Sequence, residues 1–278
     1  MKAAVHMPLI AVVLVCLAAC TERPRGQAAK PQAGDIDDPV ESANRDFFAV
    51  NQFADHNVMK PVAVAYRDNV PDGVQRGVHN VLTNLREPVV SFNDLLQGNI
   101  RRAWTSLSRF IVNTTIGGLG IFDVASKWDM PHHDADFGQT FGVWGIDTGP
   151  YVELPFLGPS DLRDAVGAAV GIVLDPFFFA GGSAVITYVG AARSGTSVLD
   201  ERARYIEALD AIESTSIDYY AAMRSLYLQR RQAVVEEGKH PDERRAGHID
   251  VRFNTPSTPD PTMPATPASP FDETAPAK

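Results

Sequence analysis

Residues 165–192 read AVGAAVGIVLDPFFFAGGSAVITYVGAA, and this stretch decides what kind of fold the chain adopts. It contains one charged residue, Asp175, immediately before Pro176. Proline removes a helical hydrogen bond and its predecessor avoids helical geometry, so the pair predicts a helix break. Each arm is then about 12–16 residues, or roughly 18–24 Å at 1.5 Å per residue. Neither arm spans a hydrocarbon core of about 30 Å.

Small residues are frequent in both arms, and the spacing of Gly167 and Gly171 allows two helices to approach closely. Two interpretations remain open: a hairpin buried in a soluble core, or a hairpin that enters one membrane leaflet. A membrane anchor near the N-terminus favours the second. Aromatic side chains just before the hairpin suit the headgroup level of a membrane, although such residues also serve plain packing. The membrane-hairpin assignment comprises Trp144, Tyr151, Phe156, Gly167, Gly171, Asp175, Pro176, Phe177 and Phe178.

The N-terminus predicts export and lipidation. The apolar run at residues 8–19 is too short to span a bilayer and has the character of a secretory signal. It ends in Leu17-Ala18-Ala19-Cys20, which resembles the lipobox of bacterial lipoproteins. That resemblance implies cleavage before Cys20 and a lipid on its sulfur and new amine; an ordinary signal peptide with a chance cysteine is the alternative. Thr21, by resemblance to sorting in Gram-negative bacteria, indicates the outer membrane.

Composition divides the chain into four parts. Residues 1–19 form the signal peptide, and the polar residues 20–37 form a flexible tether. Residues 38–237 form a helical domain. Residues 238–278 form a disordered tail, because the last 25 residues contain seven prolines and can neither pair in a sheet nor bury a core.

The 38–237 region predicts an all-α fold. Residues 90–111 place apolar side chains at steps of three and four, which predicts one amphipathic helix weakened at Gly98. Residues 200–235 predict a long helix that the Ser214-Thr215-Ser216 run divides. Because sustained period-two alternation is lacking, we expect few and short strands.

The formal charge of −9 and the scattered basic residues argue against binding to nucleic acid. The nucleophile elbow, the phosphate-binding loop and the dinucleotide fingerprint are all missing from the sequence. His132-His133-Asp134-x-Asp136 supplies zinc-ligand types, but adjacent residues seldom point at one ion, and a solvated polar loop is the favoured interpretation. The sequence therefore predicts a protein that is not an enzyme, with no metal and no cofactor.

Four charged residues, Arg109, Asp123, Arg163 and Asp164, lie among apolar ones. Charges in such places are usually paired with one another, and this is the favoured interpretation. In a membrane-embedded protein they line a polar path instead.

A series of motifs in one order resembles the MlaA/VacJ family of outer-membrane lipoproteins, most densely over residues 38–180. It begins with Asp38-Pro39-x-Glu41-x-x-Asn44-Arg45 and ends with Arg163-Asp164. The residues that carry the match are Asp38, Pro39, Glu41, Asn44, Arg45, Asn84, Pro88, Asn93, Gln97, Gly98, Arg109, Phe110, Asn113, Asp136, Phe137, Gly138, Gly149, Pro150, Tyr151, Leu154, Pro155, Gly158, Arg163 and Asp164.

The resemblance implies a ring-like bundle of amphipathic and short apolar helices that lies in one membrane leaflet around a polar channel. It implies a lipid-anchored protein on the periplasmic face of the outer membrane of a Gram-negative bacterium, associated with a trimeric porin. Its expected work is to take misplaced phospholipid from the outer leaflet and pass it to the periplasmic carrier MlaC, which maintains lipid asymmetry. A structural lipoprotein that scaffolds porins without moving lipid is the alternative.

Overall fold

The computed structural model describes residues 38–175 and 184–240. All of these belong to one structural unit that begins at Asp38. The predicted signal peptide, Cys20 and the tether lie outside the described residues. So do the hairpin residues Pro176, Phe177 and Phe178, and the tail from residue 241 onward.

The chain opens with a long helical path. Helix α2 (Glu41–Ala54) passes through one π-helical turn, η1 (Asp55–Met59), into α3 (Lys60–Asn69). This path ends at Val70, whose extended backbone is the conformation expected before Pro71. Helix α4 (Asp72–Leu96) follows and continues through Pro88.

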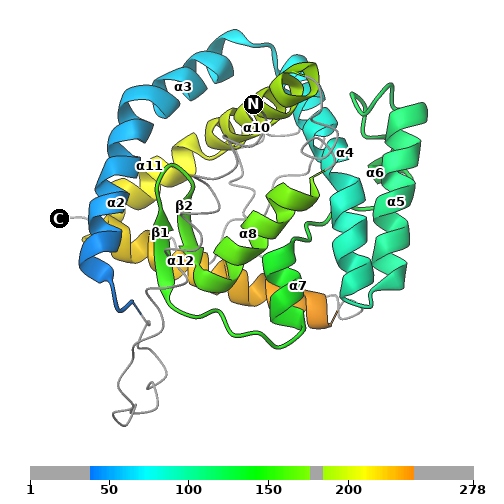
Figure 1. Cartoon of the computed structure of the whole chain (residues 1–278). Helices are drawn as coiled ribbons and strands as arrows, with labels where there is room; N and C mark the ends of the chain where they lie inside the picture. The colour runs from blue at the N-terminus through cyan, green and yellow to red at the C-terminus, as the bar shows by residue number, and fades with distance from the viewer. Residues whose placement is uncertain (1–37, 176–183, 241–278) are drawn as a thin grey trace, which may run out of the picture. The chain divides into compact units, whose positions relative to one another are not determined.

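Gly98 divides the region that the sequence pattern treats as one helix. Its φ of +80° favours glycine and turns the chain, so that α4 ends at Leu96 and α5 (Ile100–Thr115) returns beside it. The prediction of a single helix over residues 90–111 is therefore wrong. The two helices pack side by side as an antiparallel pair (Figure 1).

Four aspartates begin later helices by accepting a hydrogen bond from the backbone N–H three residues on, which satisfies a donor that the helix leaves open. They are Asp123 for α6 (Val124–Lys127), Asp136 for α7 (Phe137–Val143), Asp161 for α8 (Leu162–Leu174) and Asp218 for α12 (Tyr219–Lys239). Helices α10 (Ala184–Arg204) and α11 (Ile206–Thr215) complete the described set.

The described strands are few and short, as predicted. Strand β1 (Tyr151–Leu154) pairs antiparallel with β2 (Gly158–Asp161), with Tyr151 opposite Asp161. Asp175 ends α8 with an extended backbone, which confirms the predicted break at the Asp175-Pro176 pair. Helix α12 extends to Lys239, two residues beyond the predicted end of the helical domain at residue 237.

Contacts between elements close into a circuit. Starting at α2, they run through η1, α3, α10, α4, α7 and α12 to the β2–β1 hairpin, which returns to α2. Figure 1 looks onto this circuit. The all-α fold that the sequence predicts, and the ring-like arrangement that the family resemblance implies, are thereby confirmed. Among the described helices, none has both the length and the apolar content needed to cross a membrane.

Candidate functional site

Helix α5 shows how side chains are distributed in this fold. Its buried face carries Ala103, Ser106, Arg109 and Asn113. Its exposed face carries large apolar side chains at helical spacing: Ile100, Trp104, Leu107 and Ile111. An amphipathic helix of a water-soluble protein normally buries the apolar face, so the polarity of α5 is reversed.

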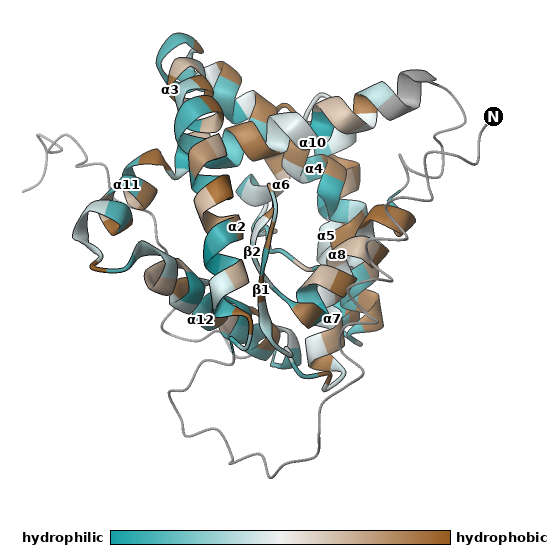
Figure 2. Ribbon diagram, turned by 60° about the vertical axis from the view of Figure 1, so that its left-hand side comes forward, coloured by the Kyte–Doolittle hydropathy of each residue, from teal (hydrophilic) through white to brown (hydrophobic). Residues whose placement is uncertain are grey.

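The reversal extends across the described part of the chain. Sixteen polar or charged residues are buried there, against twelve hydrophobic ones, of which six are alanine. Large hydrophobic side chains are exposed on most of the helices, and apolar and polar residues alternate along α2 (Figure 2). One small apolar cluster forms where Ala63, Ala203 and Ile206 meet. Such a molecule has a polar interior and an apolar outside.

Arg109 is the centre of the first buried polar group, and only 1% of it is exposed. Its Nε donates to Oε1 of the fully buried Glu87 at 2.5 Å. Its Nη2 donates to both carboxylate oxygens of Asp123 at 3.2 Å, and Nη1 donates to Ser126 and to the carbonyl of Met130. Arg109 therefore joins α4, α5 and α6 from the inside.

Asp123 lies at the partly open end of this group. Burial opposes its charge, but hydrogen bonds from Ser126 and Asn113 outweigh that effect, and with Arg109 they lower the pKa of Asp123. The preferred interpretation, that Arg109 and Asp123 are paired structurally, agrees with these contacts.

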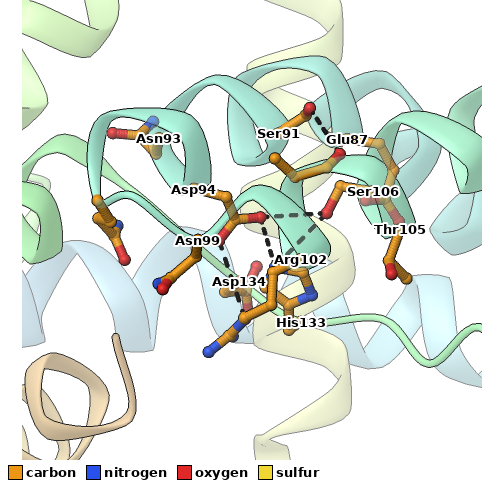
Figure 3. A network of polar contacts seen from close by, with 12 residues as sticks. Glu87, Ser91, Asn93, Asp94, Asn99, Arg102, Thr105, Ser106, His133 and Asp134 are labelled. Carbon is orange, nitrogen blue, oxygen red and sulfur yellow. Dashed lines mark hydrogen bonds and ion pairs between the residues drawn. The ribbon is translucent and has the colours of Figure 1, made fainter. Parts of the chain in front are cut away.

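The second buried group contains Asp94, Ser106 and His133 (Figure 3). Nε2 of His133 lies 2.7 Å from Asp94 Oδ2 and 3.5 Å from Ser106 Oγ. A serine–histidine–aspartate relay needs the two ring nitrogens to serve different partners, whereas here one nitrogen faces both. Ser106 is also fully buried. This group lacks the geometry of a catalytic triad.

The two histidines point to different carboxylates. His132 Nδ1 lies 3.1 Å from Glu87 Oε1, and His133 reaches Asp94. Within the described residues, no group of three or more possible ligands is positioned to hold a metal ion. The solvated-loop interpretation is wrong for His133, because its side chain is largely buried against α4.

The third group connects α7, α8 and α12. Arg231 donates to both oxygens of Asp136 at 2.8 and 3.0 Å and also reaches Asp164. Tyr227 donates its hydroxyl to Asp164 at 2.6 Å, and Arg163 pairs with Asp164 and Asp161. The prediction that Arg163 and Asp164 are paired agrees with this geometry.

Asp161 is buried in the same group. Burial disfavours its charged form and raises its pKa to about 6. Asp136, which Arg231 holds in a bidentate pair, has its pKa lowered despite its burial. Asp161 and Asp136, each at the start of a helix, thus have pKa values that are shifted in opposite directions.

The fourth group ties the first helix to the hairpin. Asn44 donates to Asp38 at 2.7 Å and to the carbonyl of Tyr151 at 3.1 Å, and accepts from the N–H of Glu153 at 2.9 Å. Tyr220 and Arg224 both donate to Asp38. The motif that opens at Asp38 is therefore a latch that joins α2, β1 and α12.

Arg45, Glu41 and Asp218 extend this latch. Arg45 Nε donates to Glu41 at 2.8 Å, and its Nη2 donates to Asp218 at 2.6 Å. The Arg45 guanidinium also stacks over the ring of Tyr220.

In the first arm of the predicted hairpin, helix α8, the glycines contact another helix, whereas the last residues are exposed. Gly167 lies directly against the backbone of Gly138, and Gly171 lies against the ring of Phe137. This spacing therefore serves helix contact between α8 and α7. The end of α8 exposes Ile172, Val173 and Leu174, which does not fit a hairpin buried in a soluble core.

The aromatic residues before the hairpin differ from one another. Trp144 and Phe156 are exposed, Phe156 by 78%. Tyr151 is only 1% exposed, and its hydroxyl donates to Glu153 at 2.6 Å. Tyr151 therefore does not belong to the membrane-facing surface and has the packing role that the sequence left open, because its partner carboxylate and the rings of Tyr220 and Tyr227 enclose it.

The other motif residues lie at turns and helix contacts. Gly98, Gly149 and Gly158 have positive φ, and Pro39 precedes α2. Asn93 accepts from Thr140, Gln97 donates to Thr140, and Asn84 donates to Thr114. Pro88 lies inside α4, Phe110 in α5 and Pro155 in the hairpin turn, while the carbonyls of Pro150 and Leu154 accept from Leu162 and Asn51.

Several residues of these buried groups were missed by the sequence reasoning: Glu87, Asp94, Ser106, Arg224 and Arg231. Their partners lie far away in the sequence or in another element. A spacing pattern along one helix therefore contains no signal for them.

Comparison with known proteins gives a consistent result. A family model described as MlaA lipoprotein matches residues 36–234. "Intermembrane phospholipid transport system lipoprotein MlaA" of Escherichia coli strain K12 is 32% identical over 213 residues, covering 73% of this chain and 80% of the relative. The same-named protein of Shigella flexneri is 33% identical over 209 residues, with the same coverage.

A solved structure also resembles this one. It is described as "Structural basis for maintenance of bacterial outer membrane lipid asymmetry". The TM-score is 0.63 at 31% sequence identity, and the match covers 71% of this chain and 98% of the other.

Proposed function

Because this chain belongs to the MlaA lipoprotein family, we propose that it serves intermembrane phospholipid transport at the outer membrane. Its work there is to remove misplaced phospholipid from the outer leaflet and so to maintain lipid asymmetry. In this role Cys20 carries the lipid anchor, and the protein faces the periplasm. No covalent bond is made or broken.

The reversed distribution of side chains is the observation that supports this role most directly. A phospholipid has a charged head and apolar tails. Exposed apolar faces such as that of α5 suit contact with acyl chains, and the buried polar groups suit a passage for the head. With no described helix able to cross a membrane, the body fits within one leaflet.

The proposed partners follow from the same surface. A trimeric porin presents an apolar wall at the depth of the hydrocarbon core, which the exposed face of α5 matches in character. Phospholipid that leaves this protein then needs a soluble carrier in the periplasm, the role we assign to MlaC.

The test is to measure outer-leaflet phospholipid in cells that lack this protein. Complementation uses wild type, Cys20→Ala and Ile111→Asp, the last of which places a charge on the exposed face of α5. We expect deletion to raise outer-leaflet phospholipid, wild type to lower it again, and both variants to fail. Gln229→Glu, on an exposed polar position of α12, is the matched control and should complement fully.

An unchanged lipid distribution on deletion contradicts the proposal. If that occurs while the protein still purifies with a porin, a porin scaffold becomes the better assignment.

A further inference from the structure

Arg86 lies on the inner side of α4. At 3.6 residues per turn, it is about 120° around the helix from Phe92 and about 180° from Leu95. Both of these side chains are exposed and apolar. From the opposite side, Arg86 approaches Asp134 in the loop before α7 and Glu201 on α10.

The contacts of Arg86 are long and open to solvent. Its Nη2 lies 3.4 Å from Asp134 Oδ1, and its Nη1 lies 3.8 Å from Glu201 Oε1. The Arg86 side chain is 48% exposed, and the two carboxylates are 52% and 61% exposed. Arg109, by contrast, is enclosed by its acceptors. The guanidinium of Arg86 therefore has N–H donors available for another acceptor.

The charge of a second arginine, on another helix, also acts on the same carboxylate. Arg230 of α12 is exposed and has no ion pair with any residue that the structure describes. A hydrogen bond from His132, together with the charges of Arg86, His132 and Arg230, lowers the pKa of Asp134 and outweighs the opposing effect of desolvation. Both arginines thus lie within electrostatic range of Asp134.

His132 provides Asp134 with an alternative partner. Its Nε2 lies 3.5 Å from Asp134 Oδ1, and its Nδ1 lies 3.1 Å from Glu87. Burial opposes the charge on this ring, but the bonds to Asp134 and Glu87 prevail and raise the pKa of His132 to about 9. Asp134 therefore keeps a cationic neighbour when Arg86 turns to another anion.

We propose that Arg86 and Arg230 form a phosphate-binding subsite that holds the headgroup phosphate of the transported phospholipid. The planar fork of arginine matches the oxygens of a phosphate in a bidentate pair, which a carboxylate at 3.4 Å does not achieve. The phosphate displaces Asp134 from Arg86, and Asp134 stays with His132. This inference rests on the proposed function and assigns the group that recognises the substrate.

The binding test uses the purified mature protein in a maltoside detergent. Three probes are titrated and followed by calorimetry: dihexanoyl phosphatidylglycerol, dihexanoylglycerol without phosphate, and inorganic phosphate. The variants are Arg86→Gln, Arg86→Lys and the double variant Arg86→Gln with Arg230→Gln. Arg76→Gln is the control, because Arg76 is exposed on the same helix and has no ion pair with the described residues.

We expect the double variant to bind phosphatidylglycerol about a hundredfold more weakly, because it lacks two charged hydrogen-bonding groups that are each worth about a tenfold change in affinity. Its affinity for dihexanoylglycerol should not change. Arg86→Lys should retain part of the affinity, and Arg76→Gln all of it. Unchanged phosphatidylglycerol binding in the double variant, or an equal loss for both lipids, overturns the proposal. Inorganic phosphate that binds as tightly as the lipid overturns the lipid headgroup as the ligand.

Complementation separates this inference from the proposed function. If deletion raises outer-leaflet phospholipid and the double variant restores it as well as wild type does, the subsite is wrong and transport stands. If deletion leaves outer-leaflet phospholipid unchanged, both the proposed transport function and the subsite are refuted. Thermal unfolding of each variant within about 2 °C of wild type shows that the fold is intact, as exposed side chains lead us to expect.

Discussion

Gly167 of α8 and Gly138 of α7 approach so closely that a methyl group on Gly167 would lie 2.4 Å from the backbone nitrogen of Gly138. No flexible side chain stands between the two backbones to absorb the added volume. The contact that holds α7 against α8 therefore depends on the absence of a side chain at Gly167.

Gly167→Ala should destabilise the protein by about 1–3 kcal/mol, because overpacking forces the two backbones apart. Gly195 is the matched control: it lies in helix α10 with nothing within 4 Å of the place of a Cβ. Gly195→Ala should leave stability unchanged or raise it by up to about 1 kcal/mol. Urea unfolding in detergent, followed by circular dichroism, measures both. Equal effects of the two substitutions contradict the close contact.

Arg109→Met should destabilise by about 3–5 kcal/mol, because it leaves Glu87 fully buried without its main cationic partner. Arg67→Met, which removes an exposed pair with its neighbour Asp68, should have no measurable effect. The same unfolding assay applies. If the double change Arg109→Met with Glu87→Leu is no more stable than Arg109→Met alone, the cost does not come from the stranded carboxylate.

Asn44→Ala should cost about 1–3 kcal/mol, since it leaves the N–H of Glu153 and the carbonyl of Tyr151 without their buried partner. The loss should appear locally as faster amide hydrogen exchange in the β1–β2 hairpin. Asn57 makes a comparable bond to its own helix but is exposed, so Asn57→Ala serves as the control. If amide hydrogen exchange in the β1–β2 hairpin of Asn44→Ala stays at the wild-type rate, the contacts of Asn44 do not stabilise this hairpin.

His132 should make stability depend on pH. Its folded-state pKa of about 9 lies above the ordinary value of 6.5, so the protonated ring stabilises the fold below pH 6.5, and that contribution is lost as pH rises toward 9. The free energy of unfolding should fall across this window in wild type and less in His132→Gln. Asp134→Asn should also flatten the curve, because it removes one of the two carboxylates that hold the proton. A His132→Gln curve parallel to wild type would refute this assignment.

Local features of the fold were predictable from the sequence. The break at Asp175 follows from Pro176, and the short strands follow from the lack of alternation. The interruption after α11 falls at Ser216, as the serine and threonine run predicts. Each of these depends on neighbours in the chain, where backbone chemistry acts directly.

What the sequence did not reveal depends on contacts between elements. Gly98 weakens a helix or turns the chain, and only the packing of α5 on α4 selects the turn. Periodicity identifies the apolar face of α5 but not the side on which it lies, because the same pattern suits a protein core or a lipid surface. Arg231 and Asp136 are 95 residues apart, and no local pattern connects them.

The outward apolar face of α5 also affects how the protein reaches its destination. A folded molecule whose large hydrophobic side chains point outward would associate with other copies in water before it met a membrane. Under the proposed function, delivery to the outer membrane therefore requires either an escort that covers these faces or folding that is completed only on arrival. The same exposed side chains that suit contact with acyl chains would thus need protection from water during that delivery.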